Sequence, residues 1–149
     1  MSFPYAHVLV PDYRAAIIDH LRSLPIMTAV VAAANITGRV IDYDAAQNVN
    51  HLALVYAGGR DSNFNVPIMF PHLNAHCMGT NGYESMRIWR TLKSLLEHPS
   101  YRMQGFVAQG CSVMDVRVGL PMELPDLGVT VWDKRVAPIY MTVNEVPVG

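Results

Sequence analysis

The side chains best suited to metal binding are two histidines and a cysteine in one short segment, His72, His76 and Cys77. Imidazole and thiolate groups bind zinc when they converge on one ion. Pro71 and Gly79 flank the segment and oppose a helix, and in a strand rising about 3.3 Å per residue the two histidines would lie about 13 Å apart. That separation is too large for one ion. We therefore expect ordinary strand residues, no metal site and no cofactor.

The sequence contains no recognisable arrangement for catalysis. A cysteine nucleophile needs a positioned base, and no motif ties any of the six histidines to Cys77 or Cys111, which suit buried apolar positions. Gly58-Gly59-Arg60 resembles a fragment of a phosphate-binding loop, but neither the G-x-x-x-x-G-K-[ST] nor the G-x-G-x-x-G pattern occurs. The acidic residues are scattered and form no evident acid–base pair. We expect that the protein is not an enzyme.

Composition indicates a single domain with a surface that another subunit covers. The chain has 149 residues, 11 basic and 12 acidic, so its net charge of -1 disfavours a mainly electrostatic nucleic-acid or membrane binder. Charged residues make up 15% and hydrophobic residues 51% of the chain, against about 25% charged in a typical soluble domain. The remaining apolar surface favours association. Two cysteines exclude a disulfide scaffold, and we expect neither a signal peptide nor a membrane span.

Two main helices are predicted. The first runs from Asp12 to Leu24 and is stopped by Pro25, and a short Ala-rich helical segment follows it. The second begins at the N-cap Asn81, with Glu84 as its capping-box partner, and ends near His98. Its spacing predicts a buried stripe of Met86, Trp89, Leu92 and Leu96, joined by Ile88 and Leu95. The other side carries Arg87, Arg90 and Lys93 and is most simply solvated; a partner-binding surface is the alternative.

Runs of apolar residues separated by turn formers predict about five strands. The first two should pair as a hairpin, a polar loop spans Gly58–Val66, and Pro71 indicates that the third strand is an edge strand or contains a bulge. Short turns between strands favour antiparallel pairing, so we expect an α+β fold with a mainly antiparallel sheet and two main helices packed on it. The predicted strands are Gly38–Asp44, His51–Ala57, Pro67–Cys77, Phe106–Val118 with a break at Gly110, and Trp132–Val146, the last preceded by a Gly119–Gly128 turn.

Several landmarks follow one another along nearly the whole chain. They are the helix Asp12–Leu24, Gly38-Arg39-Val40, the strand His51–Ala57 leading into Gly58-Gly59, His76-Cys77-Met78-Gly79 before the helix Tyr83–Leu96, the segments Gly119-Leu120-Pro121 and Pro125-Asp126-Leu127-Gly128, and the strand through Ala137-Pro138-Ile139-Tyr140-Met141-Thr142-Val143. Their joint order and spacing resemble the tail terminator (tail completion) proteins of long-tailed bacteriophages. No single motif among them is specific to that family.

This resemblance implies a structural virion protein that closes into a ring, commonly a homohexamer. The ring would cap the tail tube, end its polymerisation and join the tail to the head–neck connector proteins, with viral DNA passing through its lumen without sequence-specific binding. The chain would then be assembled in the host cytoplasm and reside at the tail–neck junction of the virion. Two alternatives remain open: a neck adaptor or head-closure protein of similar size, and a small-molecule-binding enzyme.

Two polar segments are the expected contact sites with another subunit or with the tube. The loop Gly58–Val66 carries flexible glycines and many polar side chains, so it should project from the sheet. The Gly119–Gly128 turn is the second candidate. The candidate interface residues in these segments are Arg60, Asp61, Ser62, Asn63, Asn65, Pro121, Glu123 and Asp126.

Overall fold

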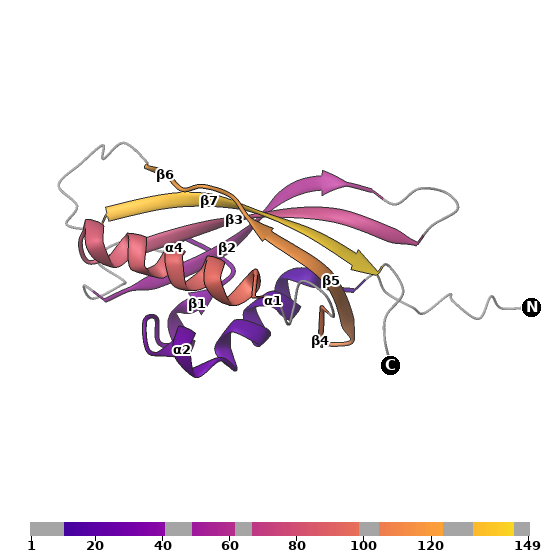
Figure 1. Cartoon of the computed structure of the whole chain (residues 1–149), viewed down its shortest axis with the longest axis horizontal. Helices are drawn as coiled ribbons and strands as arrows, with labels where there is room; N and C mark the ends of the chain where they lie inside the picture. Colours follow the sequence, from indigo (N-terminus) through magenta and orange to yellow (C-terminus); the bar gives the residue numbers. More distant parts are fainter. Residues whose placement is uncertain (1–10, 41–48, 62–66, 99–104, 124–132, 145–149) are drawn as a thin grey trace, which may run out of the picture.

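The computed structural model describes residues 11–40, 49–61, 67–98, 105–123 and 133–144, which form a curled sheet with helices on one face (Figure 1). The sheet order is β1-β2-β3-β7-β5-β4, and β6 also pairs with β7. The strands are β1 Ile36–Thr37, β2 His51–Arg60, β3 Ile68–Gly79, β4 Phe106–Ala108, β5 Cys111–Val118, β6 Met122–Glu123 and β7 Asp133–Asn144. The helices are α1 Tyr13–Arg22, α2 Pro25–Thr28, the 3-10 turn η1 Ala33–Asn35, and α4 Gly82–Leu96.

The α+β class is confirmed, but the sheet is mixed and has seven strands in the described ranges. Strands β2, β3, β5 and β7 are long, whereas β1, β4 and β6 have two or three residues each. The expected hairpin between Gly38–Asp44 and His51–Ala57 is wrong. Instead, Ile36 and Thr37 pair in parallel with Leu52 and Ala53 of β2. Residues 41–44 of the predicted first strand lie outside the described ranges.

Strand β3 lies inside the sheet, between β2 and β7, so the edge position suggested by Pro71 is wrong. The bulge is present instead: the β2–β3 register shifts between Tyr56 and Gly59, and Gly59 lies opposite Pro71. The irregular pairing beside Pro71 lets the strand tolerate a residue without a backbone N–H group. Strand β2 continues through the bulge to Arg60, which shortens the predicted Gly58–Val66 loop.

The second main helix begins at its predicted N-cap, Asn81, and Asp12, the predicted start of the first helix, is the N-cap of that helix. The Asp12 side chain accepts a hydrogen bond from the Ala15 N–H (3.1 Å), and the Asn81 side chain accepts one from the Glu84 N–H (2.9 Å). The Glu84 carboxylate does not complete the predicted capping box. It accepts a hydrogen bond from the Asn50 side chain (2.7 Å), whose amide oxygen also accepts one from the Thr80 N–H, so tertiary contacts replace the local one.

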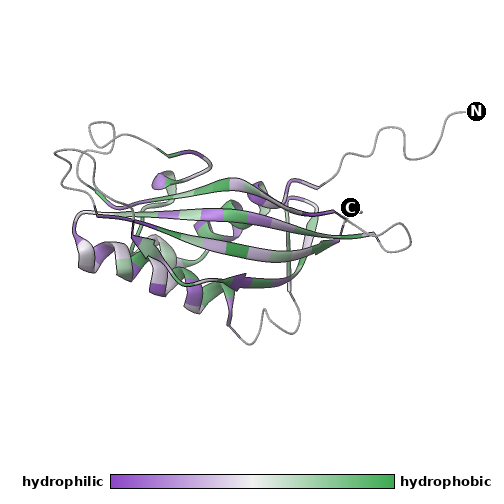
Figure 2. Ribbon diagram, turned by 90° about the horizontal axis from the view of Figure 1, so that it is seen from above, coloured by the Kyte–Doolittle hydropathy of each residue, from purple (hydrophilic) through white to green (hydrophobic). Residues whose placement is uncertain are grey.

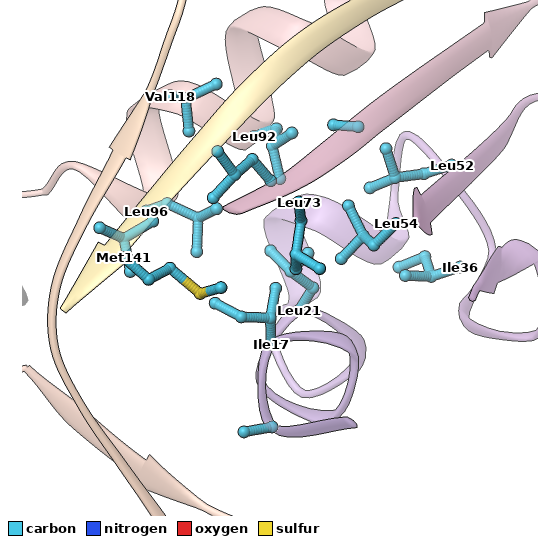
Figure 3. Close-up of a cluster of buried hydrophobic side chains, with 14 of the residues drawn as sticks. Ile17, Leu21, Ile36, Leu52, Leu54, Leu73, Leu92, Leu96, Val118 and Met141 are labelled. Atoms are coloured by element: carbon cyan, nitrogen blue, oxygen red, sulfur yellow. The ribbon is translucent and has the colours of Figure 1, made fainter. Parts of the chain in front are cut away.

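The core fills the space between the sheet and the helices. Figure 3 shows side chains from α1, α4 and the sheet meeting there, with Leu73 of β3 beside Ile17 and Leu21 of α1. Hydropathy alternates along the long strands in Figure 2, as expected when one face of a sheet is covered. The largest fully buried side chains are Ile17, Leu21, Met27, Ile36, Leu52, Leu54, Leu73, Met78, Ile88, Leu92, Leu96 and Ile139.

The predicted buried stripe of α4 is confirmed in part, at Ile88, Leu92 and Leu96. The buried residues of the helix are Ser85, Ile88, Leu92 and Leu96, whereas Met86 and Trp89 are only partly buried. The Trp89 indole donates a hydrogen bond to the Gly119 carbonyl (2.9 Å), so this ring lies at the edge of the core with its polar end satisfied. No helix of the described residues has the length and apolar character required to cross a membrane.

Candidate functional site

The candidate interface residues fall into two groups at opposite ends of the sheet. Arg60 ends β2 opposite Phe70, near the start of β3, and Asp61 follows it as an exposed residue. Glu123 lies in β6 opposite Arg135, near the start of β7. Because β3 and β7 are antiparallel, these two positions cannot form one site. Exposed Glu123 and half-buried Pro121 belong to the second group, while Ser62, Asn63, Asn65 and Asp126 lie outside the described residues.

The end of β2 and the start of β3 lie side by side and are called the β2–β3 arm here. Two glycines shape the end of this arm. Gly58 and Gly59 have φ angles of 81° and 130°, a region that favours glycine. A side chain at Gly59 would also stand 2.6 Å from the Pro71 Cα atom. The bulge therefore brings the two strands close together and directs the Arg60 guanidinium over the Phe70 ring, 4.5 Å from its centre. This predicted interface residue is held against the sheet by a cation–π contact.

A shallow hollow lies on the face of the sheet opposite the helices, next to Arg60. The side chains of His72 and Tyr140 meet edge to face in this hollow, with ring centres 4.7 Å apart. Arg117 and Asp115 form an ion pair at 3.6 Å along the same lining. The two groups that could act as bases, His72 and Asp115, thus both contact neighbouring side chains.

The predicted strand setting of the histidine–cysteine segment is confirmed. His72 and His76 both lie on β3, partly exposed, whereas Cys77 is buried on the core side. Among the described residues, no group of three or more His, Cys, Asp or Glu side chains is placed to hold a metal ion. His76 and Cys77 point to opposite faces of the strand, and His72 and His76 share a face but lie about 13 Å apart along it, so these three side chains do not converge.

The histidines should make folding stability depend on pH. Burial lowers the pKa of His76 below the ordinary value of 6.5, and the positive charge of Lys134 lowers it further. Burial also lowers the pKa of His20. The unfolded chain then binds protons more readily than the folded one, so we expect the free energy of unfolding to decrease as the pH falls below about 6.5. Urea unfolding between about pH 5 and pH 7.5 measures this slope.

The matched variants for this pH dependence are His76→Gln and His20→Gln, each of which should reduce the slope. The double variant should have the flattest profile because it lacks both histidines. A stability that rises as the pH falls through this window, or an unchanged slope in the double variant, would contradict the assignment.

Both cysteines should be unreactive in the folded protein. Burial raises the pKa of Cys77 to about 12 and that of Cys111 to about 11, the latter with a contribution from Asp12. Thiolate is the reactive form, so almost none is present at neutral pH. We expect iodoacetamide to leave the native protein unmodified and to modify both residues in denaturant, as measured by intact mass. Rapid modification of either thiol without unfolding would show that the core around it is open.

A polar cluster joins the start of α4 to β7. The Arg135 guanidinium donates hydrogen bonds to the Ser85 hydroxyl (3.1 Å) and to the Asp133 carboxylate (2.9 Å), and the Ser85 hydroxyl also donates to Asp133. The serine is fully buried. Because the carboxylate accepts from both partners, the cluster is internally satisfied and fixes the helix on the sheet.

Helix α4 also carries a surface whose apolar part the sequence does not predict. A groove between α2 and the outer side of α4 has Ile26, Tyr83 and Met86 among its apolar residues and Arg87 and Arg90 among its polar ones. The predicted basic side of Arg87, Arg90 and Lys93 is divided in the structure. Lys93 instead donates a hydrogen bond to the Val118 carbonyl (2.7 Å) and pairs with Glu97, so it borders the sheet.

Comparison with known proteins gives one informative result. No protein-family model matches the sequence, and no curated protein matches it. Among solved structures, the chain is similar to a protein chain in the virion of a native gene transfer agent particle. They share one fold. The TM-score is 0.63 at 12% sequence identity, over 97% of this chain and 99% of that chain. The match therefore covers nearly the whole chain.

Proposed function

We propose that this protein is a structural component of a phage-like virion and acts there as the tail terminator. The single observation that carries the proposal is the fold shared with a gene transfer agent virion chain over 97% of this chain. The order of sequence landmarks and the low charge support it independently. In this role the protein forms a ring, commonly a homohexamer, on the end of the tail tube. The capped tube cannot add further subunits.

The partners follow from that position. One face of the ring contacts the tail tube protein and the other contacts the head–neck connector proteins, while viral DNA passes through the lumen without sequence-specific binding. A net charge of -1 suits a lumen that DNA must traverse rather than adhere to. The location is the tail–neck junction of the virion, reached by assembly in the host cytoplasm. No catalytic group is required for any of these steps.

The two groups of predicted interface residues suit this arrangement because they lie at opposite ends of the sheet. We propose that the β2–β3 arm, with Arg60, Asp61, Ser62, Asn63 and Asn65, contacts a neighbouring subunit or the tube. The segment with Pro121, Glu123 and Asp126 provides the second contact. A ring on a tube needs contacts both around the ring and along the tail axis, and separate groups can serve each.

A neck adaptor or head-closure protein is the second candidate, because the same fold match identifies a virion chain without giving its position in the particle. The two roles differ in what fails when the protein is missing. Without a terminator, tube polymerisation continues past its normal length. Without a neck adaptor, tails of normal length accumulate unattached to heads.

The test is to delete the gene from the phage that carries it and to measure tail lengths by electron microscopy. We expect tubes of variable and excessive length, restored to normal by the wild-type protein supplied in trans. Normal-length, headless tails would replace the terminator assignment with the neck adaptor. Normal infectious particles would contradict both, and an enzyme that binds a small molecule would then become the leading alternative.

A further inference from the structure

The α4 groove, defined here by Ile26, Tyr83, Met86, Arg87, Arg90 and Leu95, exposes apolar side chains to solvent. Ile26 is 66% exposed and Tyr83 is 71% exposed, although both are large and apolar. Arg87 and Arg90 place two positive charges on the same lining. Arg87 lies 3.5 Å from Glu84, whereas no carboxylate of the described residues pairs with Arg90. The groove thus suits an apolar segment that carries a negative charge.

A segment of that composition is present on the same chain. The β6 segment, Leu120–Glu123, includes Leu120 at 78% exposure and Met122 at 64%, followed by the exposed carboxylate of Glu123. Together with Ile26 and Tyr83, Leu120 and Met122 are the most exposed large hydrophobic residues of the part of the chain that the structure describes. Among the described residues, β6 pairs with the start of β7 alone, so its outer side offers apolar side chains to a partner.

The groove and the β6 segment lie on different flanks of α4. Trp89 and Lys93, on one flank, bond to the Gly119 and Val118 carbonyls directly before the β6 segment. The groove opens on the outer side of the helix, where α2 packs. In Figure 1, α2 lies below α4, whereas β6 lies above it with the sheet. The two surfaces therefore face different neighbours.

We propose that the β6 segment of one subunit binds in the α4 groove of the next copy of this chain. Leu120 and Met122, which share one side of the segment, contact the apolar lining, and Glu123, the last residue of β6, pairs with Arg90 at the rim of the groove. A contact between two different surfaces of identical chains is head-to-tail, and repeating it by rotation produces a closed ring. The proposal rests on the ring-forming role proposed above and identifies which surfaces build the ring.

Cross-linking tests this contact directly, since Cys77 and Cys111 are buried and leave an engineered cysteine as the only accessible thiol among the described residues. One chain carries Ser94→Cys, at an exposed residue lining the groove, and the other carries Met122→Cys. The two are mixed and treated with a flexible bis-maleimide. We expect a strong cross-linked dimer from the mixture and a much weaker one from either chain alone.

In the matched control, the first chain carries Val107→Cys instead of Ser94→Cys. Val107 is an exposed residue of β4 and lies outside the groove. A mixture yield no higher than this control would overturn the proposed contact. Equal cross-linking of the Ser94→Cys chain with itself would also overturn it, because that result indicates a two-fold contact.

Charge exchange provides a second readout. Arg90→Glu in the groove chain, or Glu123→Arg in its partner, should each reduce the cross-linked yield several-fold. Combining the two should restore most of it, because the pair is re-formed with its charges reversed. If the combined variants do not restore the cross-linked yield, Arg90 and Glu123 do not pair with each other. If the wild-type protein forms a ring but the cysteine variants do not cross-link, the proposed contact is refuted and ring formation is not. If tails are normal after gene deletion, only the terminator role is refuted.

Discussion

Replacing Leu92 by alanine should lower the free energy of unfolding by about 2–5 kcal/mol, the range for removing a buried leucine side chain. Leu92 is fully buried at the centre of the buried side of α4, beneath the sheet. The change leaves a cavity between the helix and the strands that packing cannot fully close. Urea unfolding followed by circular dichroism measures the difference.

Ser94→Ala is the control for Leu92→Ala, because Ser94 lies on the exposed side of the same helix. This exchange should change the free energy of unfolding by less than about 0.5 kcal/mol. A cost below about 1 kcal/mol for Leu92→Ala would show that α4 does not pack on the sheet through this face. The comparison therefore tests whether α4 packs on the sheet through the side that carries Leu92.

Replacing Gly79 by alanine should destabilise the protein by about 1–3 kcal/mol or more, through overpacking. Gly79 ends β3 directly against the first turn of α4. An added Cβ atom would stand 2.7 Å from the carbonyl carbon of Glu84 and 2.8 Å from the Cα atom of Ser85. These are backbone atoms, so neither can rotate away. The helix must shift, which disturbs the contacts of Ser85 with β7.

Gly82→Ala is the matched control for Gly79→Ala, three residues away. Gly82 is the first residue of α4, and an added Cβ atom there would lie 3.5 Å from the Asp133 carboxylate, an ordinary contact. Alanine in a compatible helical position restricts the unfolded chain, so stability should be unchanged or should rise by up to about 1 kcal/mol. Equal losses for both variants would show that the clash at Gly79 is not the cause.

Local signals predicted the elements well. Asp12 and Asn81 are the N-caps, and the break at Gly110 separates β4 from β5. The predictions that were wrong concern how the strands pair with one another in the sheet. The short parallel strand β1 has only two residues, too few for a hydrophobic pattern to reveal. Pro71 is accepted inside the sheet because β2 forms a bulge opposite it, and nothing in the local sequence of β3 specifies that partner.

The candidate site was predicted only in part, for a related reason. Arg60 and Glu123 were predicted from polar segments, and both lie at the ends of strands. The α4 groove was missed because it combines residues from α2 and α4, such as Ile26 and Tyr83, that no local pattern connects. One feature of the sequence could have indicated the groove: Tyr83 is a large apolar residue that lies off the buried stripe of its helix. Such residues are explained by a partner more readily than by a core.

The most direct test of the account is the native mass of the full-length protein, measured alone and with purified tail tubes of the same phage. The subunit mass is 16.5 kDa. We expect one closed species of ring size, commonly six subunits, either in free solution or on the ends of the tubes. A protein that remains a monomer at every concentration and does not bind tube ends would contradict the central claim.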